Sequence, residues 1–97
     1  MAKIKDKNRE LIHNKLRSYK KLRGAWKESI DKALVQFEGD AKETLFKWYF
    51  IEHREIIPIC MDLYISQRTF FSWRDDIITA VIIQAAYDKL INPQRTE

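Results

Sequence analysis

Apolar side chains recur every third or fourth residue from position 12 to position 37, and this spacing is the strongest constraint on the fold. They stand at Ile12, Leu16, Tyr19, Leu22, Trp26, Ile30, Leu34 and Phe37. Such steps place these side chains on one face of an α-helix. Gly24 interrupts the stripe, so the pattern predicts either one helix of about 30 residues or two helices joined near residues 23–25, because glycine costs only about 1 kcal/mol inside a helix. The continuous helix would favour dimerisation, and the broken one could fold back as an antiparallel pair.

Gly39 and Asp40 separate this stripe from a second predicted helix. Glycine readily adopts the left-handed conformation that follows a helix C-terminus, and aspartate is a favoured N-cap. Glu43 stands three residues after Asp40, which is the spacing of a capping box. We therefore expect a helix from Ala41 to about residue 52. Large apolar residues crowd its second half, which places it at the centre of the core.

Two further helices are predicted between residues 55 and 90. The shorter one covers residues 55–63 and carries Pro58 near its start, where the missing N–H of proline would have had no intrahelical partner. Ser66 is a good N-cap for the longer one, which begins at residue 67 and continues to about residue 90. We expect Asn92 and Pro93 to end it, because the residue before a proline avoids the helical conformation.

The composition supports a single all-α domain. The 97 residues include 45% apolar side chains but only 2 glycines and 2 prolines, too few for a hairpin-rich sheet or a glycine-rich phosphate loop. The expected fold has four or five helices in one compact domain, with a basic N-terminal helical region over residues 1–39 and a helix-turn-helix region over residues 40–92. No apolar run approaches the roughly 20 residues that cross a bilayer.

Side chains that form disulfides, metal sites and nucleophilic centres are scarce. Cys60 is the one cysteine, so the chain forms no internal disulfide, and a reducing, cytoplasmic setting is the simplest inference. His13 and His53 lie far apart in the sequence, without further ligands at helical spacing around both. Cys60 also lacks the base and the electropositive setting that a nucleophile needs. We expect no metal, no cofactor and no enzymatic activity.

Charge is divided unevenly along the chain. Residues 1–27 hold ten Lys and Arg against two acidic residues, a net charge of +8, whereas the whole chain has a net charge of +4. Such a basic segment predicts contact with a polyanion, most often nucleic acid. The alternative is a solvated basic helix face without a partner. The phosphate ligands expected in this segment are Lys15, Lys20, Lys21 and Arg23.

Residues 55–80 have the order of a helix-turn-helix, with a short helix, a turn of about three residues and a longer capped helix. Phe70 and Trp73 are expected to face the core. The residues of the longer helix that are then directed outward are Gln67, Arg68, Phe71, Ser72 and Asp75. In a DNA major groove, arginine can bind guanine and glutamine can bind adenine through two hydrogen bonds. The alternative for Arg68 is a surface side chain paired with Asp62 or another acid.

Three stretches of the second region carry a family resemblance. They are Trp48-Tyr49-Phe50, the isoleucine-rich run from Glu55 to Leu63, and Ile65-Ser66-Gln67-Arg68-Thr69. Together they resemble the C-terminal half of the RinA/ArpU-type regulators of Gram-positive bacteriophages, which in turn resemble region 4 of sigma-70 factors. The resemblance covers roughly residues 41–90.

The resemblance implies a late-gene transcription activator in the cytoplasm of a bacterial host. Such a protein binds double-stranded promoter DNA through its helix-turn-helix, and RNA polymerase is a further candidate partner. By the family pattern, the base-reading residues are Gln67, Arg68, Phe71 and Ser72, with Thr69 and Arg74 nearer the phosphates. We expect a homodimer, which would place two recognition helices about one DNA turn apart.

The sequence departs from the family pattern after Thr69, where Asp75 and Asp76 stand in place of basic residues. Residues 41–92 hold six basic and seven acidic residues, a net charge of −1, so this half contributes little to phosphate binding. The departure leaves a rival interpretation open, in which the protein captures a transcription factor or polymerase subunit through Phe71, Trp73 and the acidic edge. A third interpretation is a small terminase-like subunit, which would form a ring-shaped oligomer.

Overall fold

Five α-helices, joined by short 3-10 and π-helical segments, form the chain that the computed structural model describes. The backbone is described for residues 3–91 and the side chains for residues 7–91, and every regular element in this part is helical. The elements are α1 (Lys3–Arg17), η1 (Tyr19–Lys21), α2 (Gly24–Leu34), η2 (Val35–Phe37), α3 (Ala41–Leu45), η3 (Phe46–Ile51), α4 (Ile56–Leu63) and α5 (Gln67–Tyr87). The predicted all-α fold of four or five helices is confirmed.

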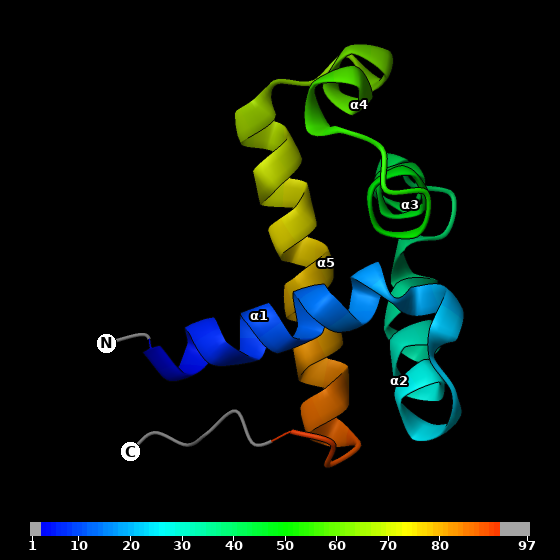
Figure 1. Cartoon of the computed structure of the whole chain (residues 1–97), viewed down its shortest axis with the longest axis vertical. Helices are drawn as coiled ribbons and strands as arrows, with labels where there is room; N and C mark the ends of the chain where they lie inside the picture. The colour runs from blue at the N-terminus through cyan, green and yellow to red at the C-terminus, as the bar shows by residue number, and fades with distance from the viewer. Residues whose placement is uncertain (1–2, 92–97) are drawn as a thin grey trace.

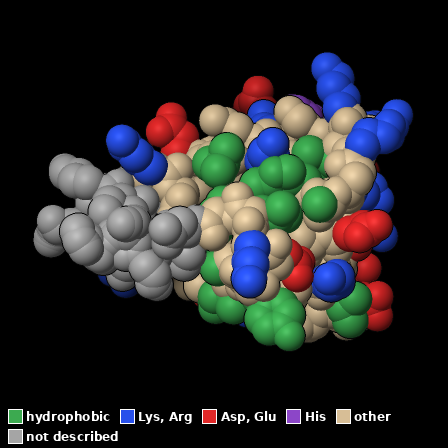
Figure 2. Space-filling view, turned by 90° about the horizontal axis from the view of Figure 1, so that it is seen from below, with side chains coloured by type: hydrophobic (Ala, Val, Ile, Leu, Met, Phe, Trp, Pro, Cys, Tyr) green, Lys and Arg blue, Asp and Glu red, His purple; other side chains and the backbone are tan. Residues whose placement is uncertain are grey.

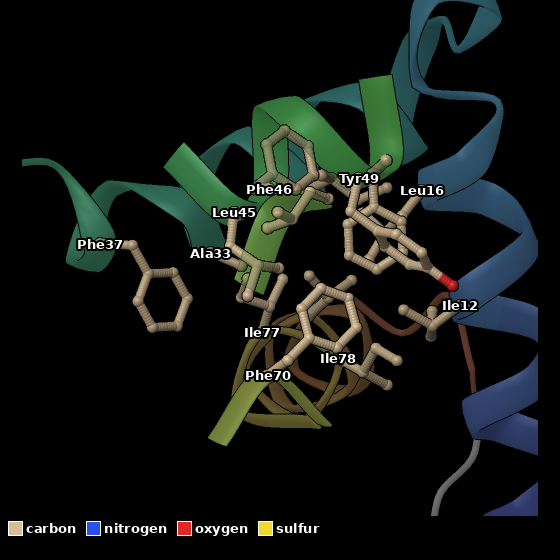
Figure 3. Packing of buried hydrophobic residues seen from close by; sticks show 14 of the residues in the cluster. Ile12, Leu16, Ala33, Phe37, Leu45, Phe46, Tyr49, Phe70, Ile77 and Ile78 are labelled. Carbon is tan, nitrogen blue, oxygen red and sulfur yellow. The ribbon is translucent and has the colours of Figure 1, made fainter. Parts of the chain in front are cut away.

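The longest helix, α5, organises the others (Figure 1). It meets α4 near its N-terminal end, is crossed by α1, and packs along α2 in its second half. Both the basic N-terminal region and the helix-turn-helix region contribute to one buried cluster, part of which is drawn in Figure 3. Its fully buried members include Ile12, Leu16, Ile30, Leu45, Phe50, Ile59, Phe70, Ile77 and Val81.

The N-terminal apolar stripe is divided between two helices, so the single long helix is excluded. α1 ends at Arg17, before the expected break at residues 23–25, and a 3-10 turn follows it. Arg23 is extended, and Gly24 begins α2 with a φ of +67°, in the left-handed region that favours glycine. The antiparallel pair is not formed either, because α1 lies across the direction of α2 (Figure 1). α2 instead buries Ile30 and Ala33 and packs along α5.

The predicted helix from Ala41 to about residue 52 is present, but its second half is π-helical. Asp40 caps α3 as expected, since its carboxylate accepts a hydrogen bond from the Lys42 N–H at 2.9 Å. From Phe46 onward the turn widens, and the Glu52 N–H donates to the Lys47 carbonyl five residues back. Three aromatic side chains of this π-helical segment are buried, namely Phe46, Tyr49 and Phe50.

α5 ends at Tyr87, three residues earlier than predicted. The chain closes the helix through Lys89, which has a φ of +62°, and the Leu90 N–H donates to the Ala85 carbonyl at 2.8 Å. This is the pattern of a left-handed C-terminal cap, here without glycine. Asn92 and Pro93, the expected stop signal, lie outside the described residues.

Candidate nucleic-acid interface

A three-residue turn connects α4 to α5, as the sequence predicted. Tyr64 occupies the left-handed conformation with φ and ψ of 57° and 46°, and the Ile65 N–H donates to the Cys60 carbonyl at 3.0 Å. Ser66 then caps α5, because its hydroxyl accepts a hydrogen bond from the Thr69 N–H at 3.1 Å. Cys60 is buried beside this turn, and burial raises the pKa of its thiol. Its thiol donates a weak hydrogen bond to the Ser66 carbonyl, at an Sγ–O distance of 3.8 Å.

The four side chains predicted to read bases lie together on the exposed surface of the first two turns of α5. Gln67, Arg68, Phe71 and Ser72 are all exposed, whereas Phe70 is fully buried beneath them. Arg68 makes no hydrogen bond or ion pair with any residue that the structure describes. Asp62 binds Arg54 at 2.8 Å, so the predicted alternative of an Arg68–Asp62 pair is wrong.

The two phosphate ligands predicted on α5 are engaged within the protein. The Thr69 hydroxyl accepts a hydrogen bond from the Ser66 hydroxyl at 3.1 Å. The Arg74 guanidinium lies 4.9 Å from the centre of the Phe71 ring and donates to the Tyr49 hydroxyl at 3.4 Å. Both side chains thus support the local structure of the interface.

The predicted phosphate ligands of the N-terminal region are divided between two environments. Lys15 is half-buried, with its ammonium group 4.8 Å from the centre of the Trp26 ring. Lys20, Lys21 and Arg23 are exposed on the segment between α1 and α2. No hydrogen bond or ion pair between described residues joins these four side chains to the exposed face of α5.

Ion pairs to distant segments neutralise the acidic residues of α5. Asp75 binds Arg9 of α1 at 2.6 Å, and Asp76 binds Lys42 of α3 at 3.2 Å. Arg9 also donates to the Thr79 hydroxyl at 2.8 Å. The two carboxylates that seemed in the sequence to oppose phosphate binding are therefore each matched by a basic side chain. Neighbouring residues alone contained no signal of this pairing.

The structure adds a set of polar residues that the sequence analysis did not select. They surround Tyr49, whose side chain points toward α1 (Figure 3). The Arg17 guanidinium lies 4.7 Å from the centre of the Tyr49 ring and donates to the Tyr49 carbonyl at 3.2 Å. The His13 Nε2 and the Tyr49 hydroxyl are 3.2 Å apart. Burial, with the positive charges of Arg74 and Arg17, lowers the pKa of His13 below its ordinary value.

A surface groove of about 600 Å³ begins at Tyr49 and extends to the first residue of α5. Arg17 contributes the end of α1, and Gln67 lines the groove from α5. The loop before α4 contributes His53, Arg54 and the carboxylate of Glu55. The groove therefore joins the basic N-terminal region to the predicted base-reading face. Among the residues that the structure describes, no three His, Cys, Asp or Glu side chains lie close enough to hold a metal ion.

Comparisons with family models, curated proteins and solved structures found no match to this chain. Within residues 3–91, no helix combines the length and the apolar character needed to cross a membrane.

Proposed function

We propose that this protein is a transcriptional regulator that binds promoter DNA through the N-terminal half of α5. The observation that carries the proposal is the exposed set Gln67, Arg68, Phe71 and Ser72 at the start of a helix that follows a three-residue turn. The resemblance to RinA/ArpU-type regulators supports the same function and suggests activation of late phage genes in a bacterial host. A homodimer, with RNA polymerase as a further partner, belongs to this proposal.

The chemistry of these side chains suits the major groove. Arg68 can donate two hydrogen bonds to guanine, and Gln67 can bind adenine at its donor and acceptor together. The exposed edge of Phe71 can contact a thymine methyl group. Each good two-point contact contributes about 1–3 kcal/mol of discrimination against the wrong base. Arg68 is available for this role, because no described acid binds its guanidinium.

The charge distribution is compatible with a polyanionic partner. The net charge of −1 over residues 41–92 overstates the repulsion, since Asp75 is paired with Arg9 of α1, which lies outside that range. The N-terminal region carries the excess of basic charge that phosphate binding requires.

The test is selection of binding sites from random duplexes of about 30 base pairs, long enough for two half-sites one turn apart. We expect the wild type to enrich a defined sequence. Arg68→Ala should bind that sequence about tenfold to a hundredfold more weakly while binding unrelated duplex almost as well, because a lost base contact removes specificity. Lys89→Gln is the matched control, since it removes one positive charge at the opposite end of α5.

Enrichment of the same sequence by Arg68→Ala would contradict base reading by this helix. Failure of the wild type to bind any duplex at about 50 mM salt would contradict DNA binding altogether.

The rival function, capture of another protein, has one observation in its favour. α4 exposes Ile57 (50%) and Met61 (69%), four residues apart on one helical face, and Tyr64 (94%) is exposed in the turn that follows. Exposed apolar side chains on one helical face are typical of a protein-binding surface. The surface first suggested by the sequence is less suited, because Trp73 packs against the core and both acidic residues are paired. Protein capture by α4 would depend weakly on salt, whereas DNA binding weakens steeply.

A further inference from the structure

Positive charge gathers around Tyr49 without a matching carboxylate. The Arg17 and Arg74 guanidinium groups both lie near its ring, at 4.7 and 6.0 Å from the ring centre. Their hydrogen bonds go to the carbonyl and the hydroxyl of Tyr49, and neither forms an ion pair with a described acidic residue. The Arg74 Nε is buried and has no hydrogen-bond partner among the described residues. This contrasts with Arg9 and Arg54, each of which binds an aspartate.

The energetic consequence is visible in the neighbouring histidine. The positive charges of Arg74 and Arg17 both act against protonation of His13, and no acidic group offsets them there. Water screens half-buried charges poorly, so both guanidinium groups act on the region around Tyr49. An anion bound beside Arg17 would offset part of this positive charge.

The groove beside Tyr49 gives an anion a place to bind next to Arg17, which lines it, whereas Arg74 lies outside its lining. Arg54 and the exposed carboxylate of Glu55 also line it. Arg54 is already paired with Asp62, so Arg17 is the basic side chain of this wall that has no acidic partner among the described residues. His53 is exposed in the same groove, and Gln67 stands at its other side as the first residue of α5. An anion held here would therefore lie directly beside the residues that face DNA bases in the proposed function.

We propose that this groove binds a backbone phosphate of the DNA duplex, with the Arg17 guanidinium as its principal ligand. The proposal rests on the proposed DNA-binding function and extends it to α1. A guanidinium group suits a phosphate, since it can donate two parallel hydrogen bonds to the phosphate oxygens. A phosphate contact of this kind fixes the register of the recognition helix and leaves base selection to Gln67 and Arg68.

The test measures affinity for an unrelated duplex as a function of salt, between about 50 and 200 mM. A plot of log K against log salt concentration has a negative slope. Arg17→Gln should reduce the magnitude of that slope by about 1, because one phosphate contact releases about 0.9 counterion. Arg17→Lys should keep the wild-type slope, which separates charge from the packing of Arg17 on Tyr49. Lys89→Gln, the matched control, should also keep that slope or change it less than Arg17→Gln does. The end of the molecule opposite α4 mixes both signs of charge (Figure 2).

A second variant guards against loss of folding in Arg17→Gln. His53→Asp adds a negative charge to the groove at an exposed residue with a φ of +59°, a conformation that aspartate tolerates. It should weaken binding about fivefold at low salt and without sequence preference. Thermal melting of each variant reports folding directly.

The site would be overturned if the wild type binds duplex but Arg17→Gln keeps the wild-type salt slope and His53→Asp keeps the wild-type affinity. The proposed DNA-binding function would still stand in that case. Absence of duplex binding by the wild type would overturn both. Saturation of the free protein by inorganic phosphate below about 1 mM, with duplex binding insensitive to Arg17, would show a site for free phosphate instead.

Discussion

Ser66→Ala tests whether the first turn of α5 depends on its side-chain cap. The Ser66 hydroxyl satisfies the Thr69 N–H at 3.1 Å, and its other hydrogen bond, to the Thr69 hydroxyl, lies at the exposed surface. Loss of an N-cap costs about 1 kcal/mol, within a range of about 0.5–2 kcal/mol. For a domain of about 100 residues this corresponds to a decrease in Tm of about 4–8 °C.

Two control variants separate capping from other effects. Ser66→Asp keeps an acceptor at the N-cap position and should retain most of the stability. Ser72→Ala removes a serine hydroxyl from an exposed position inside the same helix, where alanine has the higher helix propensity, and should raise stability by a few tenths of a kcal/mol to about 0.5 kcal/mol.

The assay is thermal unfolding of all four proteins followed by helical circular dichroism. The reasoning would be refuted by a Ser66→Ala protein as stable as the wild type, or by a Ser66→Asp protein as unstable as Ser66→Ala. A frayed first turn would also displace Gln67 and Arg68. Ser66→Ala should therefore lose affinity for a selected DNA site more than for unrelated duplex.

Three further predictions concern the core, a backbone conformation and pH. Phe70→Ala should destabilise the fold by about 3–5 kcal/mol, because this ring is fully buried against Tyr49, and denaturant unfolding measures the loss. Gly24→Ala should cost about 1–2 kcal/mol by the same measurement, since a φ of +67° strains any residue with a Cβ although no neighbouring atom blocks one. Because folding lowers the pKa of His13, the unfolded chain binds the proton first, so stability should fall as the pH drops below 6.5. Tm values at about pH 7.5 and 5.5 should show this decrease in the wild type and a smaller one in His13→Gln.

Local signals in the sequence were sufficient to predict the caps, the bounds of α4 and the exposed face of α5 in the helix-turn-helix region. Asp40 and Ser66 act as N-caps where predicted, because a cap forms between a side chain and backbone two or three residues away. The helix predicted over residues 55–63 differs from α4 by one residue at its start. The exposure of Gln67, Arg68, Phe71 and Ser72 followed from placing Phe70 inward, since helical geometry relates these positions directly.

Other features escaped prediction because they depend on how helices pack. The π-helical turn after Leu45 arises where several aromatic side chains must reach one core together, which a regular 3.6-residue period does not describe. The end of α1 at Arg17 precedes the glycine that marks the expected break. The end of α5 uses Lys89, a residue whose identity gives no sign of a left-handed conformation.

The sequence by itself determined the helical class, the caps and the spacing that exposes one face of α5, because these depend on interactions between residues a few positions apart. Only the tertiary structure decided which charges compensate each other. Asp75 of α5 forms an ion pair with Arg9 of α1. Arg17 and Arg74 instead both donate hydrogen bonds to Tyr49, and neither pairs with a described acidic residue. Such pairings depend on distances in space between segments far apart in the chain. For that reason the groove beside α5, and the unpaired Arg17 guanidinium on its wall, became visible only once the helices were packed.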